Sequence, residues 1–412
     1  MGKDIWRFNR GEWTEAYVFL KLLSDGKIYG ANEDFKKDIS KFIKIISVIR
    51  PEKEDFVLKF ENNFDNLNPT VSAMLNEIEF AVITVPELAK KAKFLYERLK
   101  TFSAKNKDTI PEIQEFLENL KFSSPKIPSL PKNFEDEFGS KTDIIVTIIN
   151  SEDGGVSTDG FSIKSHVGSP SSLFNAGDGS RLIFKINGCT EKRMHKINLV
   201  GDELKIIQAI KNDENLSLEF VKTGKTEFAG NLEYIDTRMI DVITTAMLVQ
   251  TKYLQEAKSG DVKDIVNVVS EINPLNVMYP EHFYEAKFKD FLFASLAGLT
   301  ASKKWDGKTR MTGGYIDVNK DGELLYYRAI SNEIFCSYLY ENTFIDRPDR
   351  GHNKDIAIAK AKAYFENRIV TDNEIKEIKN KNIFNFTFSL FLFIFIFNIF
   401  LFINLFNNLI YI

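Results

Sequence analysis

Three side chains on two neighbouring strand-like runs have the types and spacing of a site that cleaves phosphodiesters. Asp143 opens the β-branched run 144–149, and Lys164 lies near the end of the next run, with Ser162 two positions before it on the same strand face. A carboxylate binds Mg²⁺, and a lysine beside the attacking water helps to deprotonate it or stabilises charge on phosphorus. If the two strands pair, these groups converge on one phosphate, which predicts metal-assisted hydrolysis.

The first helix expected in the chain supplies a second acid. Residues 12–24 have helical spacing, and Asp25-Gly26 is a typical C-terminal stop. Glu12 and Glu15 fall on its otherwise apolar face, where a buried carboxylate needs a cation, a metal or hydrogen bonds. Since the hydroxyl of Ser162 is a weak metal ligand, we expect Glu15 to bind the metal, with Glu12 behind it. Simpler roles stay open, because first-turn glutamates also complement the helix dipole.

Composition limits the protein classes that fit. The 412 residues are enough for two or three core-sized units, and the formal net charge of −4 means that a DNA-binding face must be a local basic cluster. Two cysteines exclude a disulfide framework, and four histidines without metal-ligand spacing argue against zinc. Any metal should therefore be held by oxygen ligands, as Mg²⁺ is. The N-terminus lacks the apolar core of a signal peptide, so we expect a cytoplasmic protein.

The remaining pattern predicts a chain with both helices and strands. Residues 39–49 and 71–99 are expected to be helical, and the proline-marked stretch 123–133 to be a linker. A third strand is expected over 181–186. Further helices are expected near 111–120, 201–212, 238–258, 261–271 and 283–297. Asn319-Lys320-Asp321-Gly322 predicts a hairpin between 315–318 and 324–327.

Two polar clusters are candidates for reading or holding DNA. Arg and Lys recognise guanine, and acids or amides recognise cytosine or adenine. The loop after the lysine-bearing strand could reach bases through Ser169, Asn175, Asp178 and Arg181. A second cluster surrounds Trp305 and contains Lys303, Lys304, Lys308 and Arg310. For this second cluster, phosphate positioning is the favoured role over base readout, and a solvated surface is the simple alternative.

The C-terminal stretch 383–412 is uncharged and rich in Phe, Leu and Ile. Its length and hydropathy would allow a membrane-spanning helix, and the lysines of 376–381 would suit a positive-inside flank. Five asparagines interrupt the run, and its residue types are those that A/T-rich codons encode. We therefore expect a tail outside the fold that arises from translation past or out of the natural frame, with a membrane anchor as the alternative.

Three sequence blocks resemble the HpaII family of restriction endonucleases. They are Arg10-Gly11-Glu12-Trp13-Thr14-Glu15 with its continuation to Tyr29, residues 160–176 from Gly160-Phe161-Ser162-Ile163-Lys164, and 305–316 from Trp305-Asp306-Gly307. The resemblance spans residues 9–345 and fades beyond them. It implies a type II enzyme of the PD-(D/E)xK superfamily that needs Mg²⁺ and cuts duplex DNA, with CCGG as the site associated with HpaII. Asp143 and Lys164 match the core motif, and Ser162 stands at the position of its acid.

Together these observations predict an α/β protein with a PD-(D/E)xK nuclease-like mixed sheet flanked by helices. The expected parts are a helical region 1–122 that contributes the catalytic helix, core strands and recognition loop 134–200, a mixed region 201–350, a lysine-rich helix 351–382 and the tail 383–412. Expected partners are double-stranded DNA, a second copy in a symmetric dimer and a cognate DNA methyltransferase as a functional partner, with no membrane. The alternatives are a catalytically inactive DNA-binding relic and a membrane-anchored protein.

Overall fold

The computed structural model describes residues 5–64, 67–102, 107–151, 154–167, 178–200, 203–308, 312–328 and 332–345, together with residue 371. Contacts divide the chain into two compact units. Unit 1 combines Met1–Ser171 with Lys308–Tyr338, and unit 2 combines Ser172–Gly307 with Leu339–Ile412. The finer division into five parts that composition suggested stays a prediction.

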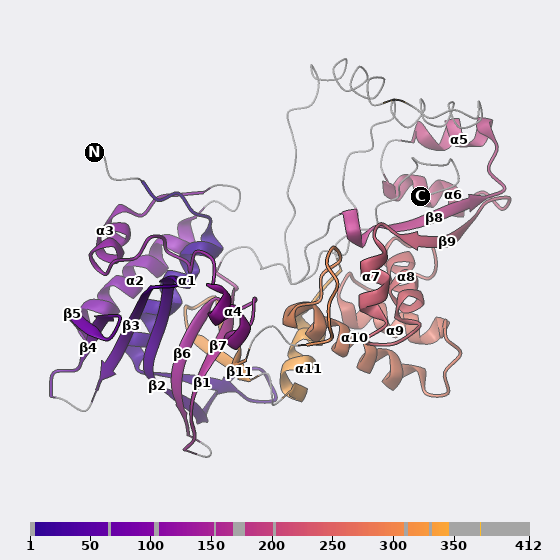
Figure 1. Cartoon of the computed structure of the whole chain (residues 1–412). Coiled ribbons are helices and arrows are strands. Elements are labelled where there is room, and N and C mark those ends of the chain that lie inside the picture. The colour runs from indigo at the N-terminus through magenta and orange to yellow at the C-terminus, as the bar shows by residue number, and fades with distance from the viewer. Residues whose placement is uncertain are drawn as a thin grey trace. The chain divides into compact units, whose positions relative to one another are not determined.

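The described residues form a mixed α/β protein, as expected (Figure 1). They contain eleven α-helices. The helices are α1 (Arg10–Asp25), α2 (Val85–Thr101), α3 (Pro111–Asn119), α4 (Lys132–Phe138), α5 (Glu191–Asn198), α6 (Glu203–Lys211), α7 (Thr226–Leu232), α8 (Met239–Gln250), α9 (Val262–Ile272), α10 (Pro280–Ala297) and α11 (Asn332–Asn342). The strands are β1 (Lys27–Ala31), β2 (Lys37–Lys53), β3 (Phe56–Asn63), β4 (Thr70–Leu75), β5 (Ile78–Thr84), β6 (Ile144–Asn150), β7 (Val156–Ser165), β8 (Leu182–Asn187), β9 (Ser217–Thr223), β10 (Gly314–Val318) and β11 (Leu324–Arg328).

Unit 1 is built on a nine-stranded mixed sheet in the order β1-β11-β10-β7-β6-β2-β3-β4-β5. Since β1 also pairs with β2, the six strands β1, β2, β6, β7, β10 and β11 close into a barrel. The pairs β7–β10 and β1–β11 are parallel, and the other pairs are antiparallel. In Figure 1 the orange β11 lies among the indigo and purple strands, so segments far apart in sequence share this sheet.

The expected strands 144–149, 161–165 and 181–186 and the hairpin around Asn319 to Gly322 are confirmed. The antiparallel pairing of β6 and β7, which the convergence of Asp143 and Lys164 requires, is also present. The third strand differs in its pairing, because β8 pairs with β9 in a separate two-stranded sheet of unit 2. Unit 1 instead takes its further strands from β10 and β11.

The predicted helices over 39–49 and 71–84 are wrong, because both segments are strands. The first is rich in β-branched isoleucine and alternates between buried and more exposed positions, such as buried Ile43 and Ile45 around exposed Lys44. The second is a hairpin, whose turn residues Asn76 and Glu77 both have positive φ. A helix begins only after it, where Thr84 caps α2.

Helix α1 has definite ends and one heavily buried side. Asn9 and Glu12 form a capping box, in which each side chain bonds to the backbone N–H of the other residue at 2.9 Å. Gly26 ends the helix at φ +66° in the left-handed region, and its N–H donates to Leu22. The buried face of α1, including Trp13, shares one hydrophobic core with residues of β2, β6, β7, β10 and β11. This core fixes the helix that carries Glu15 against the sheet that carries Lys164.

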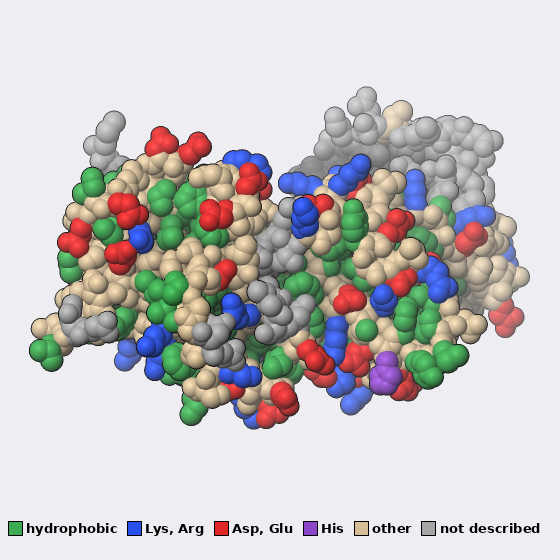
Figure 2. All heavy atoms as spheres, turned by 60° about the horizontal axis from the view of Figure 1, so that its bottom comes forward, with side chains coloured by type: hydrophobic (Ala, Val, Ile, Leu, Met, Phe, Trp, Pro, Cys, Tyr) green, Lys and Arg blue, Asp and Glu red, His purple; other side chains and the backbone are tan. Residues whose placement is uncertain are grey.

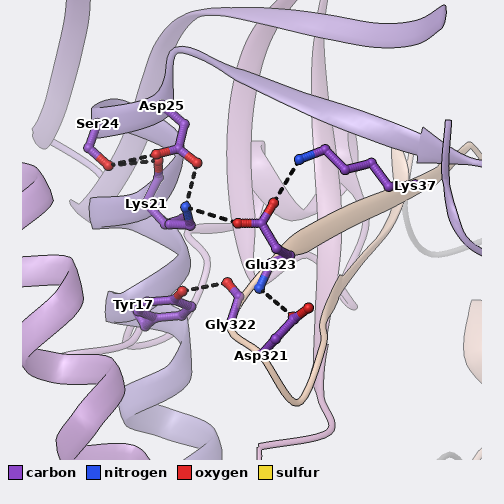
Figure 3. Close-up of polar contacts among 8 residues, drawn as sticks. All are labelled: Tyr17, Lys21, Ser24, Asp25, Lys37, Asp321, Gly322 and Glu323. Atoms are coloured by element: carbon purple, nitrogen blue, oxygen red, sulfur yellow. Dashed lines mark hydrogen bonds and ion pairs between the residues drawn. The ribbon is translucent and has the colours of Figure 1, made fainter. Parts of the chain in front are cut away.

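The second half of α1 is also bound to the turn between β10 and β11 (Figure 3). The hydroxyl of Tyr17 donates to the carbonyl of Gly322 at 2.5 Å, and Lys21 lies 3.7 Å from the carboxylate of Glu323. Lys37 of β2 pairs with the other oxygen of Glu323 at 2.8 Å. These contacts connect α1, β2 and the β10–β11 hairpin, so the helix cannot shift along the sheet without breaking them.

We expect Tyr17→Phe to lower the free energy of unfolding by about 1–2 kcal/mol, because the buried carbonyl of Gly322 would lose its donor. Chemical denaturation measures this effect. The matched control is Tyr96→Phe, which removes a hydroxyl bound to Lys320 of the same turn at an exposed site and should cost less. Equal losses in the two variants would contradict the role given to Tyr17.

The described residues contain no helix that is both long and apolar enough to cross a bilayer. The predictions made for the lysine-rich helix 351–382 and the tail 383–412 concern stretches that, except for residue 371, lie outside the described residues.

Candidate active site

Asp143 lies directly before β6 and is bound to the neighbouring strand β7. Its backbone N–H donates to Phe161 at 2.8 Å. Its Oδ2 accepts hydrogen bonds from the hydroxyl of Ser162 at 3.0 Å and from the backbone N–H of Ile163 at 2.7 Å. The carboxylate is therefore oriented by two donors on one oxygen, and in the described part of the chain no donor is seen on Oδ1.

Lys164 lies in β7 two residues after Ser162, so the two side chains share a strand face. Ser162 is buried, whereas Lys164 is partly exposed. In the parallel pair β7–β10, Lys164 stands opposite Asp317 and Ser162 stands opposite Tyr315. The bond between Asp143 and Ser162 thus brings the acid to the strand face that carries the lysine.

Glu15 of α1 interacts electrostatically with Asp143. The pKa of the Glu15 carboxyl lies well above its usual value, because burial disfavours the ionised form and the negative charge of Asp143 disfavours it further. The positive charges of Arg50 and Lys126 act in the opposite direction. The structure therefore brings together the two acids that the sequence placed on a helix and at a strand start.

Glu12 is engaged at both carboxylate oxygens. Oε2 accepts the capping bond from Asn9, and Oε1 lies 2.8 Å from the ammonium of Lys126. Burial alone would raise the pKa of Glu12, but the hydrogen bonds from Lys126 and Asn9 lower it below its usual value. Glu12 as a metal ligand stays a prediction, and in that role it would have to leave Lys126.

The donor set suits a hard divalent cation that keeps part of its water. Two carboxylates that repel each other are stabilised when a cation lies between them. Within the described ranges, no three of His, Cys, Asp and Glu form a ready-made metal cluster. Glu15 and Asp143 would hold the cation, with waters and substrate oxygens as the other ligands, which is the usual way in which proteins bind Mg²⁺.

Comparison with known proteins identifies the family. A model of the HpaII restriction endonuclease family matches residues 9–369. A type II restriction enzyme, HpaII of Haemophilus parainfluenzae, is 34% identical over 355 residues, which cover 84% of this chain and 93% of that protein. The chain belongs to the HpaII restriction endonuclease family. No solved structure matches it.

Membership of the HpaII family confirms the prediction of a type II restriction enzyme, a site-specific deoxyribonuclease. It also corrects one expectation about the extent of the resemblance. The family match continues to residue 369, beyond the limit of 345 that the sequence blocks suggested. The reason is that short signature blocks mark only the most distinctive part of a family, whereas the whole-chain match also includes the less distinctive positions between and after them.

Sequence reasoning missed a buried ion pair beside this HpaII-family site. The guanidinium of Arg50 lies 2.5 Å from Glu52, donates to the carbonyls of Ser124 and Lys126, and stacks 4.0 Å from the ring centroid of Phe122. Both charged residues of the pair are buried. An arginine inside the apolar run of β2 was the available signal, because buried charges need partners.

Arg50→Met is expected to lower the free energy of unfolding by about 3–5 kcal/mol, because it leaves the buried carboxylate of Glu52 without its cation. Denaturant titration tests this, and the double variant with Glu52→Gln should recover part of the loss. Lys59→Met is the matched control: it breaks the partly exposed Lys59–Glu61 pair of β3 and should cost below about 1 kcal/mol. A loss as small as that of the control would contradict this prediction.

The predicted DNA-contacting residues are only partly described. Ser169, Asn175 and Arg310 lie outside the described residues, and of Asp178 only the backbone is described. Arg181 is partly buried, and Lys303, Lys304 and Lys308 are exposed. The turn Asp178–Ser180 lies against Ala301, two residues before Lys303, since a Cβ at Gly179 would be 2.3 Å from the carbonyl oxygen of Ala301. Within unit 2, the residues just before Arg181 therefore lie close to the segment that carries Lys303.

His166, which follows Lys164 by two residues, belongs to a buried polar network. Its Nε2 lies 3.1 Å from the carboxylate of Asp317 and 2.8 Å from the hydroxyl of Tyr338 in α11. Tyr338 also lies 3.4 Å from Asp317. These contacts hold the end of β7 against β10 and α11, next to Lys164.

Proposed function

We propose that this enzyme hydrolyses phosphodiester bonds of duplex DNA with Mg²⁺ held by Asp143 and Glu15. The observation that carries the proposal is the hydrogen bond between Ser162 and Asp143 on the strand of Lys164. The negative charge of Asp143 also acts on Glu15 of the first helix. The antiparallel strands that carry the acid and the lysine, in a mixed sheet flanked by helices, support a PD-(D/E)xK-like core.

Each residue of the site has a separate task. When bound, Mg²⁺ supplies polarisation of the phosphate oxygens and stabilises the developing charge. Ser162 and the N–H of Ile163 orient the Asp143 carboxylate through its Oδ2. Lys164 lies on the same strand face, where its ammonium orients the attacking water and offsets negative charge on the phosphate. Glu12 and Lys126 fix the helix end from which Glu15 projects.

We propose CCGG as the recognised sequence and a symmetric homodimer as the form that reads it, since a two-fold protein matches a palindrome with one set of contacts. The named candidates for base and phosphate contacts are Ser169, Asn175, Asp178, Arg181, Lys303, Lys304, Lys308 and Arg310. On the face drawn in Figure 2, Lys and Arg side chains are interspersed with Asp and Glu. With charges of both signs on this face, DNA contacts would come from local groups of Lys and Arg. The expected functional partner in the cell is a DNA methyltransferase.

The test uses the purified full chain and two DNA duplexes of equal length and base composition. One contains a single CCGG, and the matched control contains GGCC at the same place. With Mg²⁺ we expect two discrete products from the first duplex and none from the control, and no cleavage in EDTA. Cleavage of both duplexes to a smear would contradict sequence specificity. Binding of the CCGG duplex without cleavage would instead favour the catalytically inactive relic.

A further inference from the structure

One positive charge at this site has only a structural role in the mechanism above, and none toward the substrate. Lys126 comes from the segment 123–133, which its prolines mark as a linker, yet its ammonium lies 2.8 Å from Glu12 of the catalytic helix. Its positive charge also acts on Glu15, and the charges of Glu15 and Asp143 act on it in turn. Lys126 therefore lies within electrostatic reach of both proposed metal ligands.

We propose that Lys126 contacts a non-bridging oxygen of a DNA phosphate at the cleavage site, as a second lysine beside Lys164. This inference rests on the proposed function, because it places the scissile phosphate next to Glu15 and Asp143. It assigns a substrate-binding role to a residue that neither the spacing of motifs nor the strand pattern indicated.

The backbone around Lys126 is firmly anchored. Its carbonyl accepts hydrogen bonds from the buried guanidinium of Arg50 and from the hydroxyl of Ser124. Ser123 in turn donates to Glu52, the partner of Arg50. The loop is thus fixed to the barrel by main-chain and serine contacts, while the lysine side chain takes no part in the anchor. An anchored backbone whose ammonium is not used in the anchor can hold a phosphate at a defined position.

The side chain of Lys126 has both the exposure and the donors for a ligand. It is 35% exposed, whereas that of Glu12 is 16% exposed. An ammonium carries three N–H donors, and the bond to Glu12 uses one of them. Arg50 differs on both counts, because it is buried and its guanidinium is bound to Glu52 and two carbonyls. Of these two cations near Glu15, Lys126 is the one that solvent and DNA can reach.

Charge balance gives a reason for a second lysine. Glu12, Glu15 and Asp143 together present up to three negative charges, and a DNA phosphate that approaches them adds a fourth. Opposite charges close to these groups reduce the repulsion, and their effect is larger where water is partly excluded. Lys126 is placed to reduce the repulsion on the side of Glu12, while Lys164 does so on the strand side.

The test measures DNA binding at several salt concentrations with Ca²⁺ in place of Mg²⁺, using the CCGG duplex. Each phosphate contact contributes about 0.9 to the slope of log K against log salt. Lys126→Met should weaken binding about tenfold near 0.1 M salt and reduce the slope by about 0.9 per protomer, whereas Lys126→Arg should keep the slope. Lys100→Met is the matched control, since Lys100 pairs with Glu97 on α2 and should leave the slope unchanged.

A second variant separates phosphate binding from mere neutralisation of Glu12. Glu12→Gln releases Lys126 from its ion pair but keeps its charge, so binding should be retained or tightened. If Lys126 only stabilises the helix end, Glu12→Gln and Lys126→Met should weaken binding alike, and the slope should not change in either; that result overturns the inference. Cleavage of CCGG by the wild-type enzyme is scored separately, so a failure of the proposed function is distinguishable from a failure of Lys126.

Discussion

Lys164→Ala is expected to reduce the rate of CCGG cleavage by about 10³-fold or more. The variant lacks the ammonium that activates the attacking water and offsets negative charge on the phosphate. Binding of the duplex should fall much less, since Lys164 is one of several cations near the phosphate. Single-turnover cleavage with Mg²⁺ gives the rate, and a binding titration with Ca²⁺ gives the affinity.

Lys44→Ala is the matched control for Lys164. Lys44 is an exposed lysine on β2 of the same sheet and should keep the wild-type rate within about twofold. Lys164→Arg keeps the charge but changes the shape and proton affinity of the group, so it should remain strongly impaired. Normal cleavage by Lys164→Ala would contradict the whole assignment of the site.

Glu15→Gln is expected to have opposite effects on cleavage and stability. Cleavage should fall by about 10²-fold or more, because the metal loses one of its two carboxylates. In EDTA the free energy of unfolding should rise, since burial and the charge of Asp143 both oppose ionisation of Glu15. A residue that served only the fold would not produce this combination.

Addition of Mg²⁺ should then reverse the order of stability. A cation that binds only the folded protein stabilises it, so the wild-type protein should gain melting temperature with Mg²⁺ and the Glu15→Gln variant should gain little. Glu115→Gln, an exposed glutamate on α3, is the matched control and should respond to Mg²⁺ as the wild type does. Equal gains by wild type and Glu15→Gln would remove Glu15 from the metal site.

The sequence predicted local structure well where the pattern was unambiguous. The β-branched run after Asp143 forms the predicted buried strand, and Asn319 to Gly322 form the predicted turn. It failed over 39–49 and 71–84, where apolar residues also fit a helical period. Pairing with neighbouring strands decided these segments, since β2 lies between β3 and β6 and the positive φ of Asn76 and Glu77 turns β4 back on β5.

The same distinction between local pattern and tertiary contact applies to the site. The sequence by itself determined which groups could do chemistry: the acid before a strand, the lysine on the next one and the glutamates of the first helix, because these depend on residue type and short-range period. Only the tertiary structure decided that the charge of Asp143 acts on Glu15, that Arg50 binds the carbonyls of Ser124 and Lys126, and that Lys126 pairs with Glu12. Such contacts join residues far apart in the chain, and they form because the barrel and the buried face of α1 have one shared core.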